Sequence, residues 1–466
     1  MKYILDLLLV GCSTAVLHGC SYETSLTSHS NSLRQTIHFA GSTLPSHLAV
    51  SSTKDSIAKA TLPNLANDAS LQQCLVFASL NSPELKAAFH TWKGSLSRIP
   101  QVSALADPKI SLGYFIEEVQ TRTGPTEQQL SLTQSFPWWG LLEAKGDVAT
   151  ATAKSNWHRY EMIRLDIFEK IANRWTAVVD LESEIIVVNE SFKLLAEAER
   201  IARRSYEVDK TSHDKLVRLQ VELGKLEDKL IKLENLRGPR LSALNATLGR
   251  KSDTKLRLPS SITLSPNNIT LDEAQLLISN SPLISSQDAT IQEHSLGIRV
   301  AELDAKPKWI AGITYTNLGT PLDPTVPEAG NNPIMGMVGF SIPLNQTKTD
   351  AAKDEAISKH LSAIASKEAM LHTLHAAIAE AIYLRDDSLR RIEFYESALV
   401  PRAEDALSAA LAAFSTGKTS AIELLDSQRT LLELQRNLQR SYAAALNADA
   451  TISKLIGGTT TMESIQ

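Results

Sequence analysis

The sequence predicts an α+β fold in which one unit, made of two strands and two long helices, occurs twice. Short stretches recur in the same order: Ser135-Phe136-Pro137 returns as Ser341-Ile342-Pro343, and Lys210-Thr211-Ser212 returns as Lys418-Thr419-Ser420. Ordered self-similarity of this kind is the signature of a repeated architecture. Within each unit the hydrophobic period also changes from two residues to between three and four, which indicates strands followed by helices.

The expected first unit spans residues 68–250. It begins with helical spacing interrupted at Ser82, which can cap a helix that has Pro83 at its first position. Apolar residues then alternate with small or polar ones along two strands, and a stretch without proline follows that can form one very long helix. The expected bounds are about 107–120 and 127–137 for the strands, and about 141–207 and 213–249 for the helices.

A polar linker, residues 251–269, leads to the second unit, residues 270–458. This unit repeats the order of the first, with a loop rich in Pro, Gly and Asn between its strands. Apolar side chains at steps of three or four along each long helix predict antiparallel hairpins packed as coiled coils. The expected bounds are about 306–318 and 332–343 for the strands, about 347–413 and 420–456 for the helices, and 459–466 for a C-terminal tail.

Composition limits the class of protein. A chain of 466 residues allows two to three ordinary domains, and its hydrophobic content of 43% is that of a folded protein. The net charge of -5 and the lack of a basic cluster predict no nucleic-acid partner. Aromatic residues make up only 5%, whereas Ala and Leu abound, which suits long helices that pack closely along one another.

The N-terminus reads as a targeting segment. Residues 1–19 form an expected lipoprotein signal peptide, with Lys2 ahead of a mostly apolar stretch. Cys12 and Cys20 both lie in lipobox-like settings; we favour Cys20 for acylation, because Cys12 leaves an apolar stretch near the minimum of about seven residues. Cys12, or a cleaved signal without lipid, is the alternative. Residues 20–67, rich in Ser, Thr, His and Asn, are an expected tether.

The strands have one apolar face and one small, polar face, and two interpretations compete. Such strands can lie on a soluble core with the polar face in water, or they can span a bilayer with the apolar face in lipid. The secretion signal, together with long helices that do not cover the strands, favours the membrane. Four strands cannot close a transmembrane barrel, which needs at least about eight, and unpaired edges are not tolerated in hydrocarbon. Several copies must therefore share one barrel.

With these features the chain resembles the TolC-like outer-membrane efflux channels, in particular the lipoprotein members of heavy-metal and drug pumps. The resemblance covers about residues 68–458 and is most specific at 130–138 and 414–428. It implies a homotrimer, a twelve-stranded β-barrel on a periplasmic α-helical tunnel, and a location in the bacterial outer membrane with a lipid anchor. It also implies a periplasmic membrane-fusion adaptor and an inner-membrane RND or ABC transporter as partners, in an efflux pump or a type I secretion system.

The resemblance further implies that the two helical turns dock the adaptor. Gly417 lies at the glycine of the family's tip, where a left-handed turn is free of strain; Asp209 takes that place in the first unit and tolerates the conformation less well. The expected tip residues are Asp209, Lys210, Thr211, Ser212, Gly417, Lys418, Thr419 and Ser420.

A constriction is the second implied site. Glu423 and Asp426 fall where the family places acidic rings; they are three residues apart and so share a helix face. A ring of carboxylates would favour cations and resist opening through like-charge repulsion. Lys215 holds the matching position in the first unit, and a salt bridge to a neighbouring copy could hold the tip shut. The alternative is a pair of solvated carboxylates on an exposed helix.

No enzymatic chemistry is expected. Gly417-Lys418-Thr419 lacks the upstream glycine and the preceding strand of a phosphate-binding loop, and the sequence contains no nucleotide fingerprint or paired-cysteine metal site. We therefore expect no cofactor and no resident metal. The expected function is a passive exit duct; the alternative is a lipid-anchored periplasmic coiled-coil scaffold. The cargo (metal ion, drug or protein) stays open.

Overall fold

The computed structural model describes residues 65, 68–208, 212–264 and 268–458, all within the unit that runs from Pro63 to Gln466. The expected acylation sites Cys12 and Cys20, like the tail at 459–466, lie outside these residues. The first of the two repeated units contains α2 (Leu71–Asn81), α3 (Pro83–Ser103), β1 (Lys109–Thr121), β2 (Gly124–Phe136), α4 (Leu141–Glu207) and α5 (His213–Thr247). The second contains α6 (Leu271–Ile278), α7 (Pro282–Asp304), β3 (Lys308–Leu318), β4 (Ile334–Ser341), α8 (Gln346–Phe394), η1 (Tyr395–Leu399), α9 (Val400–Ser415) and α10 (Ala421–Ile456).

Both units open with two short helices divided at a Ser-Pro pair. The Ser82 hydroxyl accepts a hydrogen bond from the backbone N–H of Leu85, and Pro83 stands at the first helical position, which confirms the predicted cap. Ser281 and Pro282 repeat this arrangement at the start of α7. The same local chemistry therefore sets the direction of the chain as it enters each half of the molecule.

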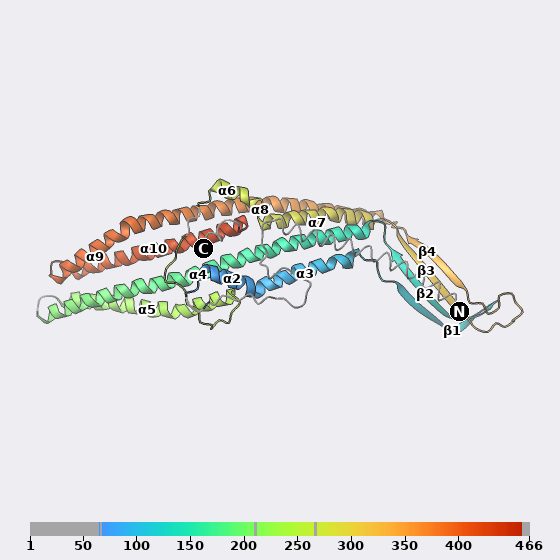
Figure 1. Ribbon diagram of the computed structural model, residues 1–466, viewed down its shortest axis with the longest axis horizontal. Helices are drawn as coiled ribbons and strands as arrows, with labels where there is room; N and C mark the ends of the chain where they lie inside the picture. The colour runs from blue at the N-terminus through green and yellow to red at the C-terminus, as the bar shows by residue number, and fades with distance from the viewer. Residues whose placement is uncertain (1–64, 66–67, 209–211, 265–267, 459–466) are drawn as a thin grey trace. The chain divides into compact units, whose positions relative to one another are not determined.

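The four strands form one antiparallel sheet in the order β1-β2-β3-β4 (Figure 1). Each predicted hairpin supplies two neighbouring strands, and the pairing of β2 with β3 joins the two halves of the chain. In the register, Leu132 lies between Ile110 and Ile313, and Ser131 lies between Ser111 and Thr314. Side chains alternate between the two faces of a sheet, so most large apolar residues of the strands share one face, while Ile310, Met335 and Met337 lie on the other.

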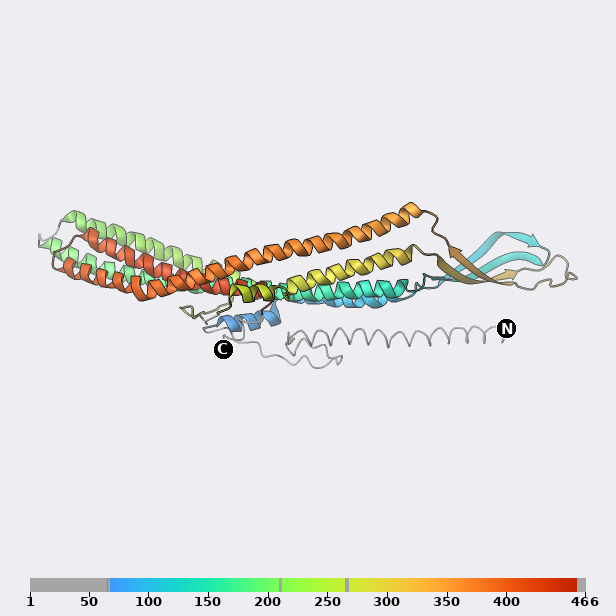
Figure 2. The same ribbon diagram turned by 90° about the horizontal axis from the view of Figure 1, so that it is seen from above.

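The long helices form two antiparallel hairpins (Figures 1 and 2). α4 has 67 residues and is about 100 Å long at 1.5 Å per residue. It packs against α5, while α8 and α9 pack against α10. One core of buried side chains joins both hairpins near their turns and includes Leu195, Leu219 and Leu424. Among the described helices, none has a segment long and apolar enough to cross a bilayer.

The stretch expected as one helix at about 347–413 is divided in the structure. A π-helical turn, η1, separates α8 from α9, and Pro401 follows it. Proline has no N–H for the carbonyl oxygen four residues earlier and its ring clashes with that carbonyl; here the carbonyl belongs to Ser397, within η1. The wider π turn is the local solution to that clash.

Near the sheet, four helices lie side by side in the order α3, α4, α7, α8. α4 packs against both α3 and α7, and α7 packs against α8. The outer helices of this group are therefore α3, which leads into β1, and α8, which follows β4. The outer helices of this layer are therefore continuous in sequence with the two edge strands of the sheet, β1 and β4.

Candidate functional site

The apolar face of the sheet is open to its surroundings. Ile110 is 73% exposed and Leu112 is 72% exposed on β1, and Val338 is 72% exposed on β4. A soluble protein rarely leaves a continuous apolar face of this kind uncovered. The side chains that form this face are Ile110, Leu112, Tyr114, Leu130, Leu132, Phe136, Trp309, Ile313, Tyr315, Ile334, Val338 and Phe340.

The opposite face of the sheet carries small and hydroxyl side chains. The Ser111 and Ser131 hydroxyl groups form a hydrogen bond of 2.6 Å across the β1–β2 pair. Gly312 lies between Thr133 and Met337, and a Cβ atom at Gly312 would come within 2.9 Å of a Thr133 methyl group. The sheet therefore has one face suited to hydrocarbon and one suited to water.

The two outer edges of the sheet are unpaired within the described part of the chain: β1 pairs with β2 alone, and β4 with β3 alone. Each edge presents backbone N–H and C=O groups to a further strand. A second copy of the chain can supply that strand.

Aromatic side chains gather where the sheet meets the helices. Trp138 and Trp139, which follow β2, have ring centroids 5.1 Å apart, and Trp139 lies 5.8 Å from Trp309 on β3. Trp309 in turn lies 5.7 Å from Phe340 on β4. Tryptophan is enriched at membrane–water interfaces, so this aromatic cluster marks one border of the apolar face.

The second helical turn, between α9 and α10, has a glycine-based helix end. Gly417 adopts φ 75°, and the N–H groups of Gly417 and Lys418 donate to the carbonyl oxygens of Phe414 and Ala413. This pair of hydrogen bonds is the Schellman arrangement, which needs a left-handed residue and so favours glycine.

Glu423 is occupied in capping α10. The Ser420 hydroxyl accepts from the Glu423 N–H at 3.2 Å, and the Glu423 carboxylate accepts from the Ser420 N–H at 3.2 Å. The Thr419 hydroxyl donates to the same carboxylate. This capping box holds Glu423 at the helix end, whereas Asp426, one turn further, is exposed on the same helix.

The first turn differs at the matching positions. Asp209, Lys210 and Thr211 lie outside the described residues. Ser212 precedes α5 without accepting a backbone hydrogen bond; its hydroxyl instead bonds the Asp214 carboxyl and lowers the pKa of that group.

The two turns also carry opposite charges at equivalent positions. The offset that aligns Ser212 with Ser420 aligns Lys215 with Glu423 and Arg218 with Asp426. Lys215 is half-buried, and Arg218 is exposed with an Asp214 oxygen 3.8 Å from its Nε atom. Arg218 was not among the predicted site residues, although the repeat offset marks it. Within the described residues of one chain, Lys215 forms no salt bridge with Glu423 or Asp426.

An ion pair between a buried carboxylate and an exposed guanidinium joins the two hairpins. Arg429 on α10 donates through Nε to Glu222 on α5 at 3.1 Å and also through one Nη. Glu222 is 8% exposed, and the hydrogen bond from Arg429 is the main cause that lowers the pKa of its carboxyl. Gln428, beside Arg429, is 2% exposed, and neither its amide nitrogen nor its amide oxygen has a partner.

Comparisons with known proteins find a similar family and a similar curated protein. Residues 274–458 match the family model described as outer membrane efflux protein. Over 404 residues the chain is 22% identical to the cobalt-zinc-cadmium resistance protein CzcC of Cupriavidus metallidurans, covering 84% of this chain and 91% of the relative.

Solved structures share the fold. The outer membrane protein VceC of Vibrio cholerae superposes with a TM-score of 0.71 at 19% identity, covering 83% of this chain and 96% of that one. The CmeC outer membrane channel of Campylobacter jejuni gives 0.71 at 16%, with coverages of 83% and 85%.

Proposed function

We propose that the chain is a member of the outer membrane efflux protein family, which its second half matches, and that three copies of it form the exit duct of a tripartite efflux pump or type I secretion system. Each copy contributes four strands to a twelve-stranded barrel and two helical hairpins to a periplasmic tunnel. The duct is passive, and energy comes from an inner-membrane RND or ABC transporter through a periplasmic adaptor. The chain itself lies in the bacterial outer membrane with a lipid anchor at Cys20.

The observation that carries this proposal is the four-stranded sheet with an exposed apolar face and two free edges. Within a bilayer, backbone groups at a free edge have no water to bond. Four strands are too few for a closed barrel. Pairing of β4 in one copy with β1 in the next removes both problems and leaves the hydroxyl-rich face to line a water-filled lumen.

Two substitutions on neighbouring residues of β4 test the orientation of the sheet. Val338→Arg places a charge on the face proposed to meet lipid, at a cost of about 2–4 kcal/mol per copy near the bilayer midplane, and should abolish the trimer in the outer-membrane fraction. Met337→Arg places the same charge on the proposed lumen face and should assemble, with reduced cation conductance in planar bilayers.

The scaffold alternative predicts a different result. If the strands form a soluble sheet, both arginines face water, and both variants should behave as the parent protein does, as subunits without channel activity. Normal membrane assembly of the Val338→Arg variant would therefore overturn the proposal, as would a parent protein that never conducts.

We propose that the tunnel narrows at Asp426. Its carboxylate is exposed, whereas that of Glu423 is engaged by its own helix end. Three copies would place three Asp426 side chains around one axis and three Arg218 side chains on the neighbouring hairpins. Asp426→Asn should weaken block of single channels by divalent cations, and Glu423→Gln should leave block nearly unchanged. Equal effects of the two substitutions on cation block would contradict the assignment of the constriction to Asp426 rather than Glu423.

The tips at 209–212 and 417–420 are the proposed docking points for the adaptor. Gly417 and Lys418 are exposed at the second tip, where they are accessible to a partner. Among cargoes, we propose divalent transition-metal cations first, because the curated relative is named for cobalt, zinc and cadmium resistance and a ring of Asp426 carboxylates attracts cations. Deletion of the gene should then lower tolerance to these metals; unchanged tolerance with lowered tolerance to organic compounds would identify drugs instead.

A further inference from the structure

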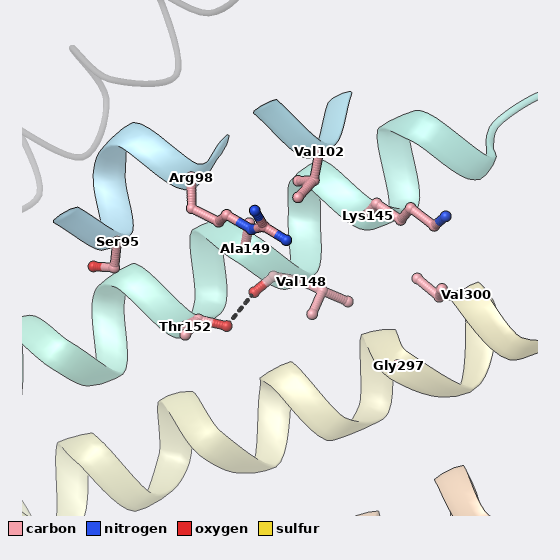
Figure 3. Close-up of a pocket in the computed structure, with 9 residues that line it drawn as sticks. All are labelled: Ser95, Arg98, Val102, Lys145, Val148, Ala149, Thr152, Gly297 and Val300. Carbon is pink, nitrogen blue, oxygen red and sulfur yellow. Dashed lines mark hydrogen bonds between the residues drawn. The ribbon is translucent and has the colours of Figure 1, made fainter. Parts of the chain in front are cut away.

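A groove of about 410 Å³ lies on α4 between α3 and α7 (Figure 3). Its walls are apolar where they are formed by Val102, Val148 and Val300. Two cationic side chains, Arg98 from α3 and Lys145 from α4, also line it, together with Ser95, Ala149, Thr152 and Gly297. The groove thus combines an apolar floor with positive charge.

Among the described residues, no acidic group forms an ion pair with either cation. The Arg98 guanidinium extends over α4 (Figure 3) and donates a hydrogen bond to the uncharged Gln101 side chain at 3.4 Å. Lys145 has no hydrogen bond or ion pair within the described parts of the chain. The described residues that line the groove include no acidic residue. Its charge is therefore available to an anionic group from outside the chain.

A glycine keeps the groove open on the side of α7. A Cβ atom built at Gly297 meets no atom within 4 Å outside the backbone of its own helix, so the space directly over this residue is open. Glycine inside a helix is less stable than alanine by about 1 kcal/mol. The helical conformation of α7 therefore does not require a glycine at position 297. The effect of Gly297 is the open space in the groove.

Neighbouring copies would leave the groove uncovered. α4 lies inside the helix layer, with α3 on one side and α7 on the other. Copies that join through β1 and β4 meet at the outer helices α3 and α8. The groove consequently faces either the lumen or the surroundings of the trimer.

Contacts along the aromatic cluster connect the groove with the apolar face of the sheet. Val300 and Trp138 pack on the same buried group, which contains Leu141 and Leu303. Trp138 contacts Trp139, and Trp139 contacts Trp309 on the apolar face. The groove is also near the border of that face, because Lys145 is only four residues, or about 6 Å, into α4.

We propose that this groove binds an anionic phospholipid of the periplasmic leaflet. Its phosphate lies between Arg98 and Lys145, and an acyl chain follows Val148 and Val300 over Gly297 toward the apolar face of the sheet. Basic pockets between helices at a membrane surface recognise anionic headgroups in this way. The inference rests on the proposed membrane orientation of the sheet.

The test measures which lipid stays with the protein. The full-length protein is reconstituted in vesicles with equal amounts of phosphatidylglycerol and phosphatidylcholine, extracted in mild detergent, and analysed for bound lipid by native mass spectrometry. The parent protein should retain phosphatidylglycerol preferentially. Loss of one cation, in Arg98→Gln or Lys145→Gln, should reduce the preference about fivefold, and the double variant about 25-fold.

Two further variants separate binding from folding. Lys154→Gln removes a lysine from the opposite face of α4, nine residues from Lys145, and should keep the preference. Gly297→Leu fills the groove but leaves both cations in place; it should lose the bound lipid without loss of thermal stability.

The outcomes are distinct for this inference and for the proposed function. Potassium conductance in pure phosphatidylcholine bilayers tests the channel without any anionic lipid. Conductance by all the variants, with unchanged phosphatidylglycerol retention in the double variant or in Gly297→Leu, would overturn the lipid site and leave the channel intact. A parent protein without conductance would overturn the channel itself.

Discussion

The two helical hairpins come from equivalent halves of the chain, yet only the first has an uninterrupted outgoing helix. α4 runs from Leu141 to Glu207 as one α-helix, whereas its counterpart changes to a π turn at Tyr395–Leu399 before it continues as α9. The offset between matching residues grows from 206 at Ser135 and Ser341 to 208 at Lys210 and Lys418. The second helix therefore contains extra residues, and a π turn accommodates one of them without shifting the helix beyond it.

The difference between the continuous α4 and the interrupted α8–α9 distinguishes two kinds of residue. Some residues set the register of a hairpin, and others only add to its length. In α4 every residue contributes to the position of the buried stripe. Around η1 the chain has a surplus residue, and none of the five residues of η1 is buried. The Glu396 carboxylate accepts from the Tyr442 hydroxyl on α10 at 3.1 Å, so the π turn is also fastened to the returning helix.

The largest expected effect comes from single-residue deletions at matched places. Deletion of Ala398 should convert η1 into continuous α-helix and leave the core residues beyond it in register, so the trimer should still form and conduct. Deletion of Ile186, an exposed residue of α4, rotates the helix beyond it by about 100° and takes Val188 and Leu195 out of the core. Each buried aliphatic side chain contributes about 2–5 kcal/mol, so no folded trimer should be recovered.

Trimer yield in the outer-membrane fraction and single-channel conductance measure both variants. If the Ala398 deletion is as damaging as the Ile186 deletion, the π turn is itself part of the packing and does not simply absorb an insertion. Deletion of a residue next to η1, such as Glu393, provides a second position at which the surplus should be relieved.

The ion pair between Glu222 and Arg429 links the two hairpins, and its removal is the next largest effect. Glu222→Gln keeps the shape of the side chain but removes the carboxylate to which Arg429 donates its hydrogen bonds. Hydrogen bonds to charged groups contribute about 1.5–3 kcal/mol, and exposure of Arg429 to solvent places the expected loss near the lower value. Thermal unfolding followed by circular dichroism measures the change. Glu227→Gln on the same helix is the control and should have little effect.

The same pair predicts how stability depends on pH. The pKa of the Glu222 carboxyl is lowered in the folded protein, with the hydrogen bond from Arg429 as the first cause. A carboxyl of this kind stabilises the folded state above its unfolded pKa, which is about 4.3, and the contribution is lost as the pH falls through the folded pKa. The stability difference between the parent and Glu222→Gln should therefore shrink as the pH is lowered below about 4. A constant difference would show that the charge of Glu222 is not its source.

Several of these features could be predicted from the sequence. The ordered repeats and the change of hydrophobic period predicted the strands and the long helices, and the resemblance to the efflux channels is confirmed by the family model and the curated relative. Alternation also predicted the two faces of the sheet: Leu132, between Ile110 and Ile313, extends the apolar face across three strands. Period and order are properties that a sequence displays directly.

Further features of the structure, among them the cap of α10 and the charge difference between the turns, also have a recognisable pattern in the sequence. Ser420 is followed three residues later by Glu423, the spacing of a capping box, and that pattern could have assigned Glu423 to the helix end. The repeat offset could have identified Arg218 as the counterpart of Asp426, and its growth between Ser341 and Lys418 could have indicated the inserted residues near Pro401.

The groove at Arg98, Lys145 and Gly297 left no such signal. Its lining comes from three helices far apart in the chain, and the pattern of one helix does not specify which others lie beside it. The Trp138 to Trp309 contacts have the same origin, because they depend on how β2 and β3 pair. Tertiary arrangement, and not local propensity, creates these features.

The smallest expected effect compares the helix caps of the two returning helices. Ser420 accepts the N–H of Glu423 in a complete capping box, whereas Ser212 accepts no backbone hydrogen bond at the start of α5. Loss of a working cap costs about 1 kcal/mol, so Ser420→Ala should lower the unfolding temperature while Ser212→Ala leaves it almost unchanged. Lys215→Glu gives the first unit the same spacing, a Ser followed three residues later by a Glu. In this Lys215→Glu background, Ser212→Ala should lower the unfolding temperature as much as Ser420→Ala does in the parent protein. If Ser212→Ala stays neutral in the Lys215→Glu background, the missing acidic residue is not what distinguishes the two turns.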